Sequence, residues 1–189
     1  MEAFLLSTGI VALAEMGDKT QLLSLLLAAK FRRPLPIILG ILVATLLNHA
    51  FAGAIGSWIT AWVGNGALRW ILGLSFLAMA VWTLIPDKLD DVDAKPARFG
   101  VFGTTLIAFF LAEMGDKTQV ATIALAAKYS AFGMVVLGTT LGMMIANVPA
   151  VLLGHKMTQA VSLKLVHAIA AMIFAVLGVL TLLNVGSLF

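Results

Sequence analysis

The chain has 189 residues, of which 61% are apolar and only 11% are charged. A soluble domain contains about 45–50% apolar and about 25% charged residues. The composition therefore predicts an integral membrane protein with no sizeable soluble domain for a separate activity. The net charge of +3 comes from basic loops and indicates no nucleic-acid partner, and the absence of cysteine excludes disulfides, thiolate metal sites and cysteine nucleophiles. Because no basic region precedes the first apolar run, we expect no cleaved signal peptide.

Six apolar runs are each long enough to cross the hydrocarbon core of a membrane as an α-helix. They cover residues 3–29, 36–63, 68–85, 101–127, 132–153 and 165–183. The polar segment 86–99 separates the third run from the fourth. The sequence therefore predicts an all-α integral membrane protein in which residues 1–85 and 100–189 are three-helix halves and residues 86–99 are a linker.

The two halves repeat each other. Residues Ala14–Gln21 and Ala112–Gln119 are identical, at an offset of 98 positions. Further matches at this offset are Leu39 and Gly40 with Leu137 and Gly138, Gly56 with Gly154, and Phe76 with Phe174; His49 falls on Asn147, and Arg69 on His167. Because three helices per half is an odd number, the second half would enter the membrane from the opposite side. Inverted repeats of this kind are typical of transporters, whose sites lie at the midplane where the halves meet.

Loop charges predict the orientation. The loops after the first, third and fifth helices carry Lys30, Arg32, Arg33, Lys88, Lys95, Arg98, Lys156 and Lys164, whereas the loops after the second and fourth carry only Arg69 and Lys128. Cytoplasmic loops are enriched in lysine and arginine. We therefore expect a multi-pass protein with both termini outside and the linker in the cytoplasm.

The repeated motif places ionisable side chains inside two apolar runs. These side chains are Glu15, Asp18 and Lys19 in the first copy and Glu113, Asp116 and Lys117 in the second. On a continuous helix, Glu15 and Asp18 share one face, and Lys19 reaches back to Glu15. Gly17 and its counterpart Gly115 allow close packing, or a looser helix whose carbonyl oxygens become additional ligands.

The charge of these six groups predicts what the site carries. A charged residue at a helix centre costs about 2.5–3.5 kcal/mol to insert, so pairing, protonation or a bound cation must offset most of that cost. Two lysines cannot neutralise four carboxylates, and about two negative charges remain when all six groups are ionised. One divalent cation balances them, and so do two protons. The sequence therefore predicts exchange of a divalent cation against protons.

The ligand types bear on the ion. Carboxylate and amide oxygens suit hard ions such as Ca²⁺, Mn²⁺ and Mg²⁺. The thioethers of Met16 and Met114 would favour Mn²⁺ if they faced the acids, and otherwise pack against lipid or other helices. Asn48 and Asn147 are either neutral ligands or groups that hydrogen-bond between helices. His49 is either a proton relay or a hydrogen-bonded histidine, and we expect the two lysines to hold the acids rather than bind the substrate.

The doubled Glu-Met-Gly-Asp-Lys-Thr resembles the signature Glu-x-Gly-Asp-Lys-Ser/Thr of a family of cation/proton exchangers, which includes bacterial manganese exporters and the Golgi calcium/manganese exchangers of eukaryotes. The resemblance spans essentially the whole chain, and its size and loops are most similar to the bacterial members. It implies that Glu15, Asp18, Glu113 and Asp116 bind the cation. It also implies that Gln21 and Gln119 complete the shell, with Asn147 in the fifth helix and Asn48 or His49 in the second.

The sequence and the resemblance together predict a secondary transporter in a bacterial inner (plasma) membrane that exports Mn²⁺ in exchange for protons. The runner-up is a Ca²⁺/proton exchanger with the same site. We expect no enzymatic activity, because the zinc-protease and serine-hydrolase signatures are absent, and no cofactor. A non-transporting membrane assembly factor and an amino-acid exporter are the alternatives from other classes. The expected partners are the metal cation, protons and the lipid bilayer, and a homodimer is left open.

Overall fold

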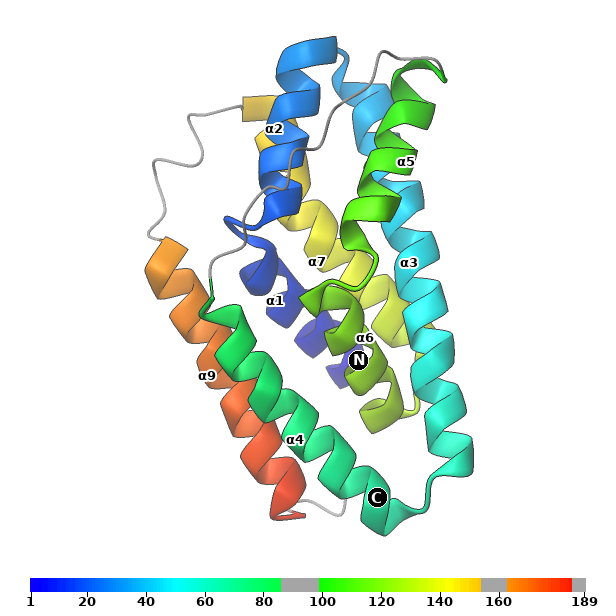
Figure 1. Cartoon of the computed structure of the whole chain (residues 1–189), viewed down its shortest axis with the longest axis vertical. Helices are drawn as coiled ribbons and strands as arrows, with labels where there is room; N and C mark the ends of the chain where they lie inside the picture. Colours follow the sequence, from blue (N-terminus) through cyan, green and yellow to red (C-terminus); the bar gives the residue numbers. More distant parts are fainter. Residues whose placement is uncertain (86–98, 154–162, 185–189) are drawn as a thin grey trace.

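A computed structural model describes residues 1–85, 99–153 and 163–184, and these residues form α-helices joined by short connections (Figure 1). The helices are α1 (Glu2–Glu15), α2 (Lys19–Phe31), α3 (Pro34–Trp62), α4 (Asn65–Thr83), α5 (Gly100–Glu113), α6 (Lys117–Tyr129), α7 (Phe132–Leu153) and α9 (Leu163–Leu182). The predicted all-α fold is confirmed, since the described ranges contain no strand. The predicted linker lies almost entirely outside these ranges.

Four helices, α3, α4, α7 and α9, are long and apolar enough to cross a membrane. The longest, α3, has 29 residues, and a helix rises about 1.5 Å per residue, against a hydrocarbon core about 30 Å thick. Large apolar side chains such as Phe51 and Trp62 are exposed on its surface, as lipid contact requires. The bounds of these four helices agree with the prediction to within three residues at each end.

The two remaining predicted helices are not continuous, which corrects the prediction of single helices over 3–29 and 101–127. The first is divided into α1 and α2, and the second into α5 and α6, at the two copies of the motif. The physical cause is the glycine of the motif, which takes a positive φ of 84° at Gly17 and 78° at Gly115; this conformation ends a right-handed helix. The number of membrane crossings and the inversion of the second half stay predictions.

The two halves pack against each other through equivalent contacts. Helix α1 packs on α7, and its counterpart α5 packs on α3. A Cβ atom on Gly138 of α7 would lie 2.6 Å from the carbonyl oxygen of Phe4 in α1. A Cβ atom on Gly40 of α3 would lie 3.0 Å from the carbonyl oxygen of Phe102 in α5. Each glycine thus lets one half approach the first helix of the other half closely, as small residues do between membrane helices.

The last helix of each half forms a separate pair at one side of the bundle. Helices α4 and α9 pack along each other, and the rings of Phe76 and Phe174 stack with centroids 6.4 Å apart. This pair also contacts α1 and α6, which occupy the same end of the molecule, whereas α2 and α5 lie toward the other end (Figure 1). The two motif breaks therefore lie inside the bundle, between its two ends.

Candidate functional site

The two motif breaks have the same local structure. Glu15 and Glu113 are the last residues of α1 and α5, and Asp18 and Asp116 are the N-caps of α2 and α6. Each break is held by the glutamine that ends the motif: the N–H of Gly17 donates to Gln21 Oε1 at 2.9 Å, and the N–H of Gly115 donates to Gln119 Oε1 at 2.8 Å. Identical residues thus build identical breaks.

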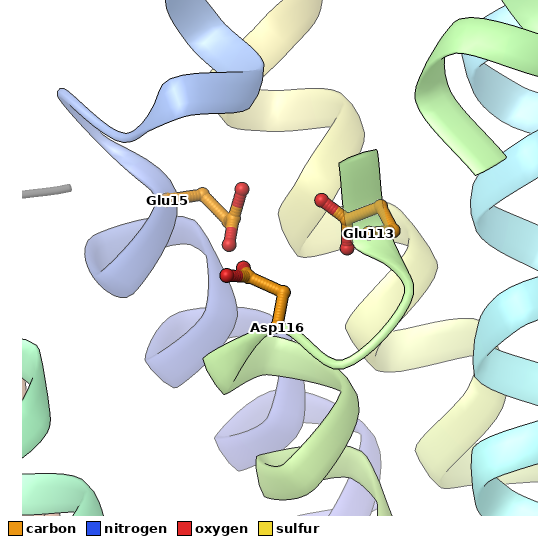
Figure 2. A group of neighbouring side chains, drawn as sticks. All are labelled: Glu15, Glu113 and Asp116. Carbon is orange, nitrogen blue, oxygen red and sulfur yellow. The ribbon is translucent and has the colours of Figure 1, made fainter. Parts of the chain in front are cut away.

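Three carboxylates from the two breaks converge. Figure 2 shows Glu15, Glu113 and Asp116 directed toward one another from α1, α5 and the start of α6. One oxygen of each lies within 4.8 Å of the others, and all three side chains are buried. Both halves of the chain therefore contribute to one site. It is the only such group of three potential metal ligands within the described residues.

The lysines of the motif pair across the two halves. Lys19 Nζ lies 2.9 Å from Asp116 Oδ1, and Lys117 Nζ lies 3.5 Å from Asp18 Oδ1. This corrects the expectation that Lys19 reaches back to Glu15, because the break removes the helical geometry that would bring these two residues together. The side chain of Lys117 is 1% exposed and that of Lys19 is 26% exposed. The pairing ties each aspartate to the opposite copy of the motif.

The threonines of the motif hold the glutamates, a role that the sequence analysis missed. Thr20 Oγ1 donates to Glu15 Oε2 at 2.6 Å, and Thr118 Oγ1 donates to Glu113 Oε2 at 3.1 Å. The signal was the presence of threonine at the same position of both copies. The other oxygen of each glutamate, and Asp116 Oδ2, are buried without a hydrogen-bond partner. Buried carboxylate oxygens are costly unless a cation or a proton compensates them, so these atoms suit a hard divalent cation.

The side-chain amides of Gln21, Asn48 and Asn147, which the sequence predicted as neutral ligands of the ion, make hydrogen bonds to other groups of the protein. Gln21 Nε2 donates to the carbonyl oxygen of Ala146 at 2.9 Å, and Asn48 Nδ2 donates to that of Phe110 at 3.1 Å. Asn147 Oδ1 accepts a hydrogen bond from Ser24 at 2.8 Å. These hydrogen bonds join helices of the two halves. The group of potential metal ligands consists of the three carboxylates alone and includes none of these amides.

His49 and the motif methionines occupy different positions relative to the cluster. His49 is fully buried, with Nε2 4.0 Å from Glu113 Oε2. Met114 is 56% exposed and therefore lies outside the buried group of carboxylates. Met16 contributes a backbone contact, because its carbonyl oxygen lies 2.6 Å from His167 Nε2 in α9. This contact with α9 was not anticipated from the sequence.

Comparisons with known proteins identify the relatives of this chain. The family model described as "Divalent cation/proton antiporter GDT1" matches residues 3–91 and 101–187. A relative from Vibrio cholerae serotype O1, named "Putative manganese exporter", is 48% identical over 96% of this chain and 90% of its own length. A GDT1-like protein from Synechocystis is 28% identical over 96% of this chain and 97% of its own length. Another GDT1-like protein, from Arabidopsis thaliana, is 27% identical over 97% of this chain and 96% of its own length.

No solved structure matches the chain. The family model nevertheless matches both halves, including both copies of the motif. The Vibrio cholerae relative is aligned over nearly its whole length. These matches show that the chain belongs to the GDT1 family of divalent cation/proton antiporters, a transporter family rather than a class of enzymes.

Proposed function

We propose that this protein exports Mn²⁺ from the cytoplasm in exchange for protons, with Glu15, Glu113 and Asp116 as the ion-binding carboxylates. One observation carries the proposal: oxygens from both copies of the motif lie within 4.8 Å of one another at fully buried side chains. Carboxylates this close repel one another strongly in a medium of low dielectric. A divalent cation among them replaces repulsion by attraction, and hard cations take oxygen ligands of this kind.

The lysine pairs support exchange rather than simple binding. Lys19 and Lys117 each lie beside an aspartate, so the two negative charges that the lysines leave uncompensated fall on Glu15 and Glu113. One Mn²⁺ neutralises them, and two protons do the same. Neither loaded form then carries a net charge into the membrane. The expected stoichiometry is therefore one Mn²⁺ for two protons.

Helix ends of both kinds meet at the two breaks, since α2 and α6 begin at the aspartates, and the two helix ends that carry the glutamates favour a cation. Helices α1 and α5 end at the two glutamates, and the C-terminal end of a helix carries a partial negative charge. Broken helices whose ends meet at a central site are a recurrent feature of transporters. In our proposal, the two halves rock about this site and expose it alternately to the two sides of a bacterial inner membrane. Positive loops and the linker face the cytoplasm.

The choice of Mn²⁺ is supported by the Vibrio cholerae relative, which is named "Putative manganese exporter". A Ca²⁺/proton exchanger is the second candidate, because a cluster of carboxylate oxygens suits Ca²⁺ as well. The exposed Met114 thioether adds nothing to the preference for Mn²⁺. Discrimination between the two ions therefore rests on the size and charge of the carboxylate cluster.

Transport by purified protein in proteoliposomes tests the proposal. Vesicles that contain a Mn²⁺-sensitive dye and carry an imposed proton gradient should take up Mn²⁺ in the direction opposite to proton flow, and uptake should stop when the gradient is collapsed. Glu15→Gln and Glu113→Gln should each abolish uptake. Lys164→Met removes an exposed charge of α9 and should leave uptake unchanged.

The same assay separates the candidate functions. Faster proton-driven uptake of radioactive Ca²⁺ than of Mn²⁺ at the same concentration would support the Ca²⁺/proton exchanger. Normal Mn²⁺ uptake by both glutamine variants would refute the proposed site. A Glu15→Gln/Glu113→Gln protein that transports no ion, yet rescues cells lacking the wild-type protein, would support a non-transporting membrane assembly factor.

A further inference from the structure

A buried ammonium outside the carboxylate cluster joins α6 to the α4–α9 pair. Lys128, near the C-terminal end of α6, is 6% exposed and donates to Thr181 Oγ1 of α9 at 3.0 Å. Its Nζ also lies 5.9 Å from the ring centroid of Phe76 in α4 and 5.7 Å from that of Tyr129. A buried lysine needs such partners. This group, the Lys128 contact, therefore holds α4 and α9 to one end of the bundle.

The repeat supplies the same residues at the opposite end. At the offset of 98, Lys128 corresponds to Lys30, Thr181 to Thr83, and Phe76 to Phe174. Their surroundings differ, however. Lys30 keeps the contact with its neighbouring ring, because its Nζ lies 5.6 Å from the centroid of Phe31, the counterpart of Tyr129, but Lys30 is exposed whereas Lys128 is buried. Thr83 is buried and donates to the carbonyl oxygen of Met79 in its own helix at 2.8 Å. The sequence thus contains the residues of a group equivalent to the Lys128 contact, but Lys30 is exposed in this conformation whereas Lys128 is buried.

A second pair of equivalent positions shows the same difference. His167 of α9 reaches the first motif break, 2.6 Å from the carbonyl oxygen of Met16. Its counterpart in α4 is Arg69. The guanidinium of Arg69 lies over the ring of Trp70 at 5.6 Å, and its Nε is buried without a hydrogen-bond partner. Both differences have one geometric cause: the α4–α9 pair lies beside α1 and α6, toward one end of the bundle (Figure 1).

We propose that Lys128 and Lys30 are alternate positioning residues of the transport cycle. Lys128 holds the α4–α9 pair in the conformation described above. In the opposite conformation Lys30 donates a hydrogen bond to Thr83 and packs against the ring of Phe174. We name this group the Lys30 contact. The proposal rests on the proposed transport function, which requires two conformations. Because the two halves share these residues, a conformation in which the halves exchange roles makes equivalent contacts and has a similar energy.

Cross-linking between engineered cysteines tests the exchange, since the chain has no cysteine of its own. Ser130→Cys with Leu183→Cys reports the Lys128 contact, and the equivalent pair Arg32→Cys with Ile85→Cys reports the Lys30 contact. All four positions are exposed and lie outside both contacts. Each pair is treated with a short bifunctional maleimide in proteoliposomes, and the yields of the two cross-links are compared in three backgrounds: wild type, Lys128→Met and Lys30→Met.

We expect Lys128→Met to raise the ratio of the Arg32–Ile85 cross-link to the Ser130–Leu183 cross-link about tenfold, the lower end of what a hydrogen bond to a charged group contributes. Lys30→Met should lower the same ratio. Lys164→Met, at an exposed lysine of α9, is the matched control and should leave the ratio unchanged. A ratio that does not move in either variant overturns the proposal.

Parallel measurements keep this result distinct from the test of the transport function. Mn²⁺ uptake by the cysteine-free protein is measured in the same vesicles, and size-exclusion elution confirms that each variant is folded. Opposite shifts of the ratio in a protein that moves no Mn²⁺ would refute the transport function and support the alternate contacts. Normal Mn²⁺ transport with an unchanged ratio would refute the alternate contacts alone.

Discussion

The two lysines of the repeated motif should differ in how strongly they stabilise the fold. Lys117 pairs with Asp18 while 1% exposed, and Lys19 pairs with Asp116 while 26% exposed. Removing one partner of a buried ion pair costs about 3–5 kcal/mol, because the other charge stays buried and uncompensated. A partly exposed pair is screened, and an exposed pair contributes about 0.2–1 kcal/mol. We therefore expect Lys117→Met to lower the free energy of unfolding by about 3 kcal/mol and Lys19→Met by about 1 kcal/mol.

Reversible unfolding in mixed detergent and SDS micelles, followed by tryptophan fluorescence, measures these two values. The double variant Lys117→Met/Asp18→Asn removes both charges and should recover at least half of the loss caused by Lys117→Met alone. The matched double variant Lys19→Met/Asp116→Asn should show a much smaller recovery. Equal losses for the two single variants, or no recovery in the first double variant, would show that burial does not set the strength of these cross-half pairs.

Two further changes test the motif breaks. Gly115→Ala should lower the free energy of unfolding by about 1–2 kcal/mol in the same SDS titration, because Gly115 has a φ of 78°, which alanine adopts only with strain. An added Cβ would meet no atom within 4 Å, so the loss comes from backbone conformation alone. Gly133→Ala, in equally open space within α7, should not destabilise the protein, and equal losses at both positions would contradict this explanation. Thr20→Val should weaken the apparent affinity for Mn²⁺ about tenfold in the proteoliposome assay, because residues that orient a metal ligand typically contribute 10–100-fold. Thr8→Val removes a hydroxyl that donates only to the carbonyl oxygen of Phe4 and should leave the affinity unchanged; equal effects of the two threonine variants would mean that the bond to Glu15 has no role in binding.

The apolar runs and the repeated octapeptide predicted much of the fold and the site. Apolar length predicted α3, α4, α7 and α9 because membrane helices need continuous hydrophobic surface. The repeat predicted that carboxylates from the two halves form one site, and the structure places Glu15 beside Glu113 and Asp116; that these groups bind an ion stays a prediction. These features depend on residue type and order alone, so a single sequence was sufficient to find them.

The breaks and the cross-half pairs could not be predicted in the same way. A glycine within an apolar run is compatible with a continuous helix and with a positive φ, and the surrounding pattern did not distinguish the two at Gly17. The pairing of Lys19 with Asp116 depends on how the halves pack, whereas the sequence offered Glu15 as a nearer partner. The contact of His167 with Met16 likewise depends on the position of α9, which no local pattern encodes.

The crossing of the lysine pairs has a consequence for the synthesis of the protein. Each lysine compensates an aspartate of the other half, so the first half leaves the ribosome with Asp18 lacking the partner that arrives 99 residues later in the chain, at Lys117. Until the second half is inserted, the early helices carry a charge that the bilayer does not stabilise. The first half alone should therefore stay bound to the insertion machinery or be degraded, and we expect a stable membrane protein only after the second motif has been completed.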